Sequence, residues 1–140
     1  MAVFLNATGV KIGTLDISAY VSSATLTQAA DELEITAMGD SSRKYVAGLQ
    51  TGKLDLEFFN DFAASSVCAA LQTAIYTTVT AKLIPVGGAT PTISATNPLY
   101  TVSILINNLT PIAGAAGEMS KSSLSFTCNS TIVQTTTGTW

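Results

Sequence analysis

The residues that come nearest to a catalytic motif lie between positions 41 and 53. Ser41-Ser42-Arg43-Lys44 has the S-x-x-K spacing of serine acyl enzymes, in which a lysine amine activates a serine hydroxyl. That chemistry needs companion motifs that the sequence lacks, and a hydrophilic loop explains the same residues. Gly48 and Gly52-Lys53 resemble a phosphate-binding P-loop, but the spacing is wrong and no Ser or Thr follows the lysine. We therefore predict neither an acyl-enzyme site nor a nucleotide site.

The side chains that most often hold metals or move protons are scarce. Histidine is absent, which removes the commonest general base and the usual zinc ligand. The acidic run Asp31-Glu32-Leu33-Glu34 lacks the interleaved carboxylates and glycine turn of a hard-cation loop. We interpret it as a solvated strand edge or a subunit contact. Cys68 and Cys128 are expected to be small buried hydrophobic side chains. We predict no enzyme, no metal and no cofactor.

The composition of the 140 residues indicates a folded chain with few surface charges. Hydrophobic residues make up 47% and charged residues only 11%, against about a quarter in a typical protein. Threonine (21) and serine (14) supply the polar surface instead. A soluble monomer normally exposes many charges, so a surface this poor in them indicates extensive contact with partners. The net charge of -3 argues against wrapping of nucleic acid.

The beginning of the chain does not resemble a targeting segment. Residues 1–6 lack a basic region and a long apolar run, so we expect no signal peptide. No segment approaches the roughly 18 consecutive apolar residues of a membrane span, so we expect no membrane anchor. We therefore expect synthesis in a cytoplasm.

The elements that must position these residues are mainly strands. Period-two patterns and turn residues predict strands over residues 10–15, 21–28, 33–36, 53–59, 77–86, 100–106 and 123–129. The clearest alternation is in 53–59, where Leu54, Leu56 and Phe58 alternate with Asp55 and Glu57. We predict an antiparallel β-sandwich or small barrel in a single domain over residues 1–140.

Three segments depart from this strand pattern. Residues 37–52 are rich in glycine, and we predict a long loop between strands. Residues 62–76 carry apolar side chains at helical spacing after an Asn60-Asp61 cap, and we predict one helix on the flank of the sheet. Residues 134–140 have little to pack except Trp140, and we predict a C-terminal arm.

The predicted strands leave one polar, almost uncharged face. It contains Asp55, Glu57, Thr101, Ser103, Ser125 and Thr127. On a lone sandwich this face is the solvated side of an antiparallel sheet, whereas in a ring of subunits it could line a channel.

Several short stretches resemble the tail tube (major tail) proteins of long-tailed bacteriophages. They are DISAYV at 16–21, ADELEITAMGD at 30–40, RKYVAGL at 43–49, KLDLEFFNDF at 53–62, SATNPLY at 94–100 and NLTPIAG at 108–114. The resemblance implies a tail-tube-type sandwich whose hexameric rings stack into a hollow tube through which DNA leaves the capsid. It implies the tape-measure, tail terminator and tail-tip proteins as partners, and a place in the virion tail after assembly in a bacterial host cytoplasm.

The resemblance also gives roles to the residues singled out above. The six residues of the polar face would line the lumen, where a neutral to acidic surface lets DNA slide. The loop residues Asp40, Ser41, Ser42, Arg43, Lys44 and Tyr45 would contact neighbouring subunits or rings. Asp31, Glu32 and Glu34 of a neighbour are possible acidic partners for Arg43 and Lys44.

Two other functions are compatible with the sequence. One is the inner tube of a contractile tail or related injection machine, which differs by the sheath around the tube. The other is a stand-alone β-sandwich that binds a carbohydrate or adheres to a surface. That module needs an exposed aromatic platform, for which the sequence offers Tyr20, Tyr45, Tyr76, Tyr100 and Trp140 without an obvious cluster.

Overall fold

The computed structural model of the chain describes residues 8–63 and 66–140. These residues form one helix and eight strands: β1 (Gly9–Ile12), β2 (Leu15–Asp16), β3 (Val21–Glu34), β4 (Tyr45–Phe59), α1 (Val67–Ala74), β5 (Thr78–Ile84), β6 (Leu99–Leu105), β7 (Lys121–Cys128) and β8 (Val133–Thr135). The prediction of a mainly β, antiparallel chain with one helix is confirmed. Residues 1–7 of the predicted domain lie outside the described part.

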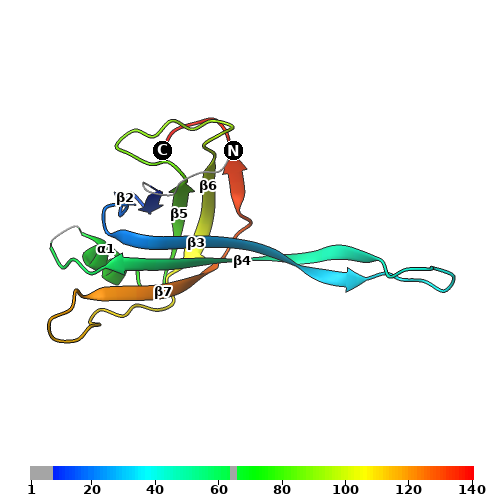
Figure 1. The fold of residues 1–140 in the computed structure, drawn as a ribbon, viewed down its shortest axis with the longest axis horizontal. Helices are drawn as coiled ribbons and strands as arrows, with labels where there is room; N and C mark the ends of the chain where they lie inside the picture. Colours follow the sequence, from blue (N-terminus) through cyan, green and yellow to red (C-terminus); the bar gives the residue numbers. More distant parts are fainter. Residues whose placement is uncertain (1–7, 64–65) are drawn as a thin grey trace.

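The strands form a single antiparallel sheet that bends into two layers. Its order is β2-β1-β5-β6-β7-β4-β3, and β8 also pairs with β6. In Figure 1, β3, β4 and β7 run along the long axis of the molecule, while β5 and β6 cross it. We call β3, β4 and β7 the first layer, and β1, β2, β5, β6 and β8 the second. Within the described residues β2 and β3 do not pair, so the fold is an open sandwich rather than a closed barrel.

The hydrophobic core lies between the two layers and follows the period-two pattern. Leu54, Leu56 and Phe58 of β4 are at most 1% exposed, and they pack in one cluster with side chains from the second layer such as Val102 and Ile104. Alternate residues of each strand therefore point inward, and the intervening polar residues point away from the core.

The C-terminal part of the chain joins the two layers. β7 pairs with β4 along its length but meets β6 only at its end, where Cys128 pairs with Ile104. Five residues after Cys128 the chain enters β8, which pairs with the other end of β6. Residues 134–140 are therefore not a free arm as predicted, because Gln134 and Thr135 belong to β8 and Lys11 Nζ lies 5.8 Å from the centre of the Trp140 ring.

The helix is shorter than the predicted residues 62–76. Asp61 does not cap it: its carboxylate accepts a hydrogen bond from the Ala63 amide, and its carbonyl accepts one from the Ser66 hydroxyl, so the chain turns before α1 begins. At the other end Tyr76 has a φ of 65° and its amide binds the Ile106 carbonyl, which returns the chain to the sheet. Residues 64 and 65 lie outside the described part.

The predicted loop over residues 37–52 is wrong for its second half. β4 begins at Tyr45 and pairs with β3 out to Glu34, so the two strands form a long hairpin that extends far beyond the body (Figure 1). The prediction was wrong because Gly48 and Gly52 were interpreted as loop residues. A Cβ on Gly48 would lie 3.2 Å from Leu33, and one on Gly52 would lie 3.0 Å from Cys128 Cβ. These glycines allow close packing across a strand rather than a turn.

Candidate functional site

The first layer carries a polar outer face. Register pairs Asp55 with Thr25 and Ser125, Glu57 with Ser23 and Ser123, and Lys53 with Thr27 and Thr127. Because residues directly opposite one another in an antiparallel ladder share a face, these side chains form one surface. We call it the polar face; it comprises Ser23, Thr25, Thr27, Lys53, Asp55, Glu57, Lys121, Ser123, Ser125 and Thr127.

The charges of the polar face are balanced. Lys53 Nζ lies 3.6 Å from Asp55 Oδ1, and Lys121 forms an ion pair with Glu57 while lying 5.5 Å from the centre of the Phe59 ring. The two carboxylates were predicted to lie on this face, whereas neither lysine was. Period-two spacing would have identified Lys53, since it stands two residues before Asp55. Lys121 needed the register of β7 against β4.

Thr101 and Ser103 do not belong to the polar face. They lie on β6, opposite Lys82 and Thr80 of β5, on the outside of the second layer. Because the two layers enclose the core, their outer faces point away from each other. The structure thus brings together Asp55, Glu57, Ser125 and Thr127, and separates Thr101 and Ser103 from them.

The projecting part of the β3–β4 hairpin is a second distinctive surface. We call residues 29–51 the arm; all of them are exposed except Asp40 and Gly48, which are half-buried. Its large hydrophobic side chains lie in solvent: Leu33, Ile35, Met38, Tyr45, Val46 and Leu49 are 42% to 104% exposed. The arm therefore displays apolar side chains that no part of the described chain covers.

The predicted acidic partners lie on the arm itself. Glu32 pairs with Ala47 and Glu34 with Tyr45, so both carboxylates share one side of the ribbon. Leu33 pairs with Val46 on the other side, which is therefore apolar. Asp31 lies on that apolar side, where its Cβ and the Leu33 side chain flank Gly48.

The tip of the arm, residues 35–44, is ordered by its own hydrogen bonds. The Asp40 carboxylate accepts one from the Ala37 amide at 2.8 Å and one from Lys44 Nζ at 2.7 Å. These two bonds hold the pKa of Asp40 below its usual value. Arg43 has no carboxylate within ion-pair distance in the described part of the chain. It is therefore the basic group that the tip leaves available.

An apolar groove lies at the end of the body that carries α1. It has a volume of about 230 Å³ and is lined by Phe62, Cys68, Ala69, Gln72, Leu109 and Pro111. We call it the end groove. Phe62 is 63% exposed, and Ile112 in the adjoining segment is 86% exposed. Cys68 is a free, buried thiol whose Sγ lies 3.5 Å from Asn60 Oδ1.

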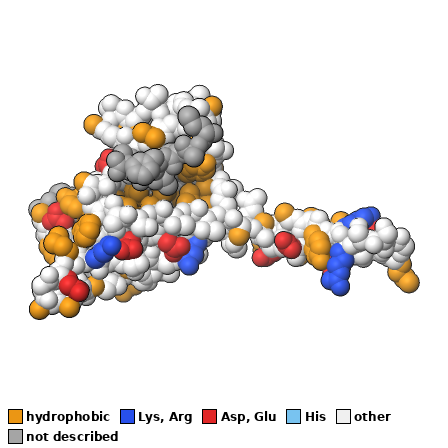
Figure 2. All heavy atoms as spheres, viewed as in Figure 1, with side chains coloured by type: hydrophobic (Ala, Val, Ile, Leu, Met, Phe, Trp, Pro, Cys, Tyr) orange, Lys and Arg blue, Asp and Glu red, His pale blue; other side chains and the backbone are white. Residues whose placement is uncertain are grey.

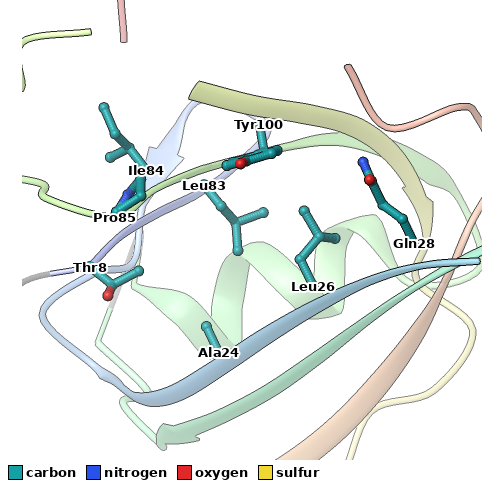
Figure 3. Close-up of a pocket in the computed structure, with 8 residues that line it drawn as sticks. All are labelled: Thr8, Ala24, Leu26, Gln28, Leu83, Ile84, Pro85 and Tyr100. Atoms are coloured by element: carbon teal, nitrogen blue, oxygen red, sulfur yellow. The ribbon is translucent and has the colours of Figure 1, made fainter. Parts of the chain in front are cut away.

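A cavity opens between the two layers beside β3. It has a volume of about 490 Å³, and Figure 3 shows Ala24, Leu26 and Gln28 of β3 facing Leu83 and Tyr100 of the second layer across it. Its polar groups are hydroxyls and one amide, and the Tyr100 hydroxyl already lies 3.2 Å from Gln134 Nε2. We therefore interpret it as a gap between the two layers of the sandwich and not as a catalytic pocket.

Among residues 8–63 and 66–140, no three His, Cys, Asp or Glu side chains come together in a group that could hold a metal ion. In the same residues no helix has the length and apolar character needed to cross a membrane.

The comparisons with known proteins identify a structural neighbour but no relative by sequence. Neither a protein-family model nor a curated protein matches the chain. Among solved structures, a chain from the virion of a native gene transfer agent particle is similar, with a TM-score of 0.75 over 96% of this chain and 99% of that one. At 12% identity this likeness shows the fold alone. A neighbour from a virion particle is consistent with the resemblance to phage tail tube proteins.

Proposed function

We propose that this chain is a structural virion protein that polymerises into a phage tail tube. Its rings, six subunits each, stack into a conduit for DNA, and the chain carries out no catalysis. The observation that carries the proposal is the arm, a two-stranded ribbon with uncovered apolar side chains on a body whose fold resembles that of a virion chain. An isolated two-stranded ribbon is only marginally stable in water, so an arm of this length needs partners.

The first layer supplies the joints between subunits of a ring. β3 pairs only with β4 within the described residues, so its other edge of 14 residues is open. On its opposite side β7 has no strand partner over residues 121–126 of the described chain, because β6 pairs only with residues 127 and 128; the segment before β7 contacts this side through Asn108 Nδ2, which donates a hydrogen bond to the Ser125 carbonyl. Open edges invite pairing with another chain. Joining β3 of one subunit to β7 of the next continues the sheet, and repetition of this contact closes a ring.

The polar face then lines the lumen of the tube. Its carboxylates and lysines neutralise one another, and the remaining side chains are hydroxyls. Such a wall neither captures phosphates, as unpaired lysines would, nor strongly repels them. Asp55, Glu57, Ser125 and Thr127 are retained as lumen residues, together with Lys53 and Lys121. Thr101 and Ser103 are assigned to the outside of the second layer.

The partners follow from this role. They are other copies of the chain, a tape-measure protein inside the growing tube, tail terminator and tail-tip proteins at its ends, and double-stranded DNA in passage. The arm, with Asp40, Ser41, Ser42, Arg43, Lys44 and Tyr45 at or near its tip, contacts neighbouring subunits or rings. The chain is placed in the virion tail, after assembly in the host cytoplasm.

Electron microscopy of the purified protein at high concentration tests the proposal. We expect rings and stacked tubes with a central channel, formed spontaneously or after addition of tail-tip proteins. A protein that stays monomeric under both conditions would overturn the proposal. A lone binding module predicts that monomer, but its aromatic platform has little support, because Tyr45, Tyr76 and Tyr100 lie on the arm, after α1 and on β6.

A further inference from the structure

We infer that the tip of the arm docks into the end groove of a second copy of the chain, head to tail. This inference rests on the proposed function and names the surface that receives the arm. The apolar part of the contact joins Met38 and Ile35 of one copy to the groove beside Phe62 and Leu109 of the next. The charged part joins Arg43 of the first copy to Asp61 and Glu118 of the second.

The end groove is preformed. Its two walls are the region of α1 and the segment 106–120 between β6 and β7. Hydrogen bonds tie these walls together: Asn60 donates to Ser120 Oγ at 2.8 Å, and Ser122 Oγ lies 2.8 Å from both Asn60 Oδ1 and the Thr110 carbonyl. A groove held in this way can receive a partner without first being ordered, which lowers the entropic cost of binding.

The tip of the arm presents a matching apolar end. Met38 is fully exposed, at 104%, and Ile35 is 57% exposed. Gly39, with a φ of 96°, and the Asp40 carboxylate fix the turn that presents Met38. An unbranched methionine adapts to an irregular apolar groove, so its exposure at the apex favours insertion into a partner.

The two surfaces are complementary in charge. Asp61 precedes Phe62 directly, and Glu118 belongs to the same connecting segment as Leu109. Figure 2 shows acidic side chains, with a basic one nearby, among hydrophobic ones at the end of the body away from the arm, and basic side chains at the tip of the arm. Because opposite potentials suppress wrong pairings, Arg43 gives the contact direction as well as affinity.

The placement of the two surfaces allows a head-to-tail contact that repeats along one direction. The helix α1, which contributes Cys68, Ala69 and Gln72 to the end groove, and the tip of the arm lie at opposite ends of the long axis of the molecule (Figure 1). Because the contact joins two different surfaces of the chain, repeating it in one direction gives an open filament. This contact therefore stacks subunits along the tube, whereas the sheet edges join them around the ring.

A mixing experiment tests the docking apart from tube formation. The tip variant combines Met38→Asp with Arg43→Glu and retains its groove; the groove variant combines Phe62→Asp with Glu118→Arg and retains its tip. Each is expected to stay unstacked alone. Their mixture is expected to form a species of twice the mass in analytical ultracentrifugation, because one intact tip meets one intact groove.

The outcomes separate the two proposals. The docking is overturned if the wild type forms tubes and either variant alone still stacks. It is also overturned if the wild type forms tubes and the mixture gains no mass. In both cases the tube function is left standing. A mixture that doubles in mass while the wild type never forms tubes would support the docking and overturn the tube function. Val86→Asp, a change at a 49% exposed side chain in the loop after β5, is the control for an added surface charge and should not affect stacking.

A charge exchange within one chain identifies the partner of Arg43. Arg43→Glu should raise the critical concentration for stacking at least tenfold, and adding Glu118→Arg to the same chain should recover most of this loss. Recovery by Glu32→Arg with Glu34→Arg, but not by Glu118→Arg, would overturn the assignment and place the contact on the acidic side of a neighbouring arm.

Discussion

β3 and β4 each consist of two halves that differ completely in their surroundings. In the half of β4 that belongs to the body, residues 53–59, every second side chain is buried in the core. In the half that belongs to the arm, residues 45–51, Gly48 is half-buried and every other residue is exposed. The hydrogen-bonded ladder continues through both halves, with a register shift between Ala30 and Glu32.

The difference between the two halves of β4 shows that backbone pairing and side-chain burial contribute differently to the stability of the subunit. Pairing alone extends a ribbon away from the body, but it contributes little net stability, because water competes for the same hydrogen bonds. Burial of apolar area holds the body together. The large apolar side chains of the arm are exposed in the subunit, which is why the proposed function assigns them to contacts between subunits.

The largest effect on the folding of the subunit is expected from the buried half. Phe58→Ala removes a side chain with 0% exposure from the core between the layers. Loss of a buried phenyl group costs about 3–5 kcal/mol in the free energy of unfolding. Urea denaturation followed by circular dichroism measures it. A loss under about 1 kcal/mol would show that Phe58 does not support the fold as its burial indicates.

The exposed half is expected to respond in the opposite way. Leu49→Asp changes a side chain that is 80% exposed on the arm, so the free energy of unfolding of the subunit should change by no more than about 0.5 kcal/mol. Assembly into tubes should nevertheless be strongly impaired, because a charge would be buried at a contact between subunits. Denaturation curves and electron micrographs of the same preparation measure the two effects.

A conservative variant gives the control for Leu49. Leu49→Met keeps an apolar side chain of similar volume and should assemble like the wild type. If Leu49→Asp assembled normally, or if it unfolded as easily as Phe58→Ala, the contrast between the two halves of β4 would be wrong.

The same contrast explains which elements could be predicted from sequence. The body half of β4 was predicted because a core on one side imposes alternation of apolar and polar residues. Residues 33–36 of the arm were predicted as a strand, but residues 37–52 were predicted as a loop, because neither side of the arm meets a core that would impose a periodic pattern. Gly48 and Gly52 strengthened the error, since their role in close packing depends on Leu33 and Cys128, which are distant in sequence.

The candidate sites show the same limit. Alternation correctly placed Asp55 and Glu57 on an outward face, but it could not tell which layer each strand joins. It therefore grouped Thr101 and Ser103 with them. The end groove was not predicted at all, because it depends on the hydrogen bonds of Asn60 with β7 and the preceding segment.

A smaller effect on stability is expected from the polar face of the body half. Asp55→Lys with Glu57→Lys breaks two ion pairs and leaves four lysines without a carboxylate partner on this face. Exposed ion pairs contribute about 0–1 kcal/mol each, so the subunit should still fold and assemble. DNA delivery should fall, because unpaired lysines bind phosphates in the lumen. Infectivity of virions that carry the variant measures this loss.

Neutral substitutions distinguish loss of the acids from gain of positive charge. Asp55→Asn with Glu57→Gln leaves Lys53 and Lys121 as the unpaired cations, so it should reduce infectivity less than the lysine variant. Unchanged infectivity in the lysine variant, with normal tubes, would show that the polar face does not line the lumen.

The smallest effect on the subunit is expected at the tip of the arm, where order depends on Asp40. Its pKa in the folded chain lies below the usual value because Lys44 and the Ala37 amide bind its charged form. A carboxyl group with a lowered pKa contributes stability above its unfolded pKa and loses it as the pH falls through the folded pKa. The tip should therefore be ordered at neutral pH and lose order below about pH 4, while the body keeps its core.

Asp40→Asn should show weak protection of the tip already at neutral pH. Hydrogen exchange of residues 35–44, compared with that of residues 53–59, measures both effects; equal protection of the tip in the wild type and the variant would show that other contacts order it.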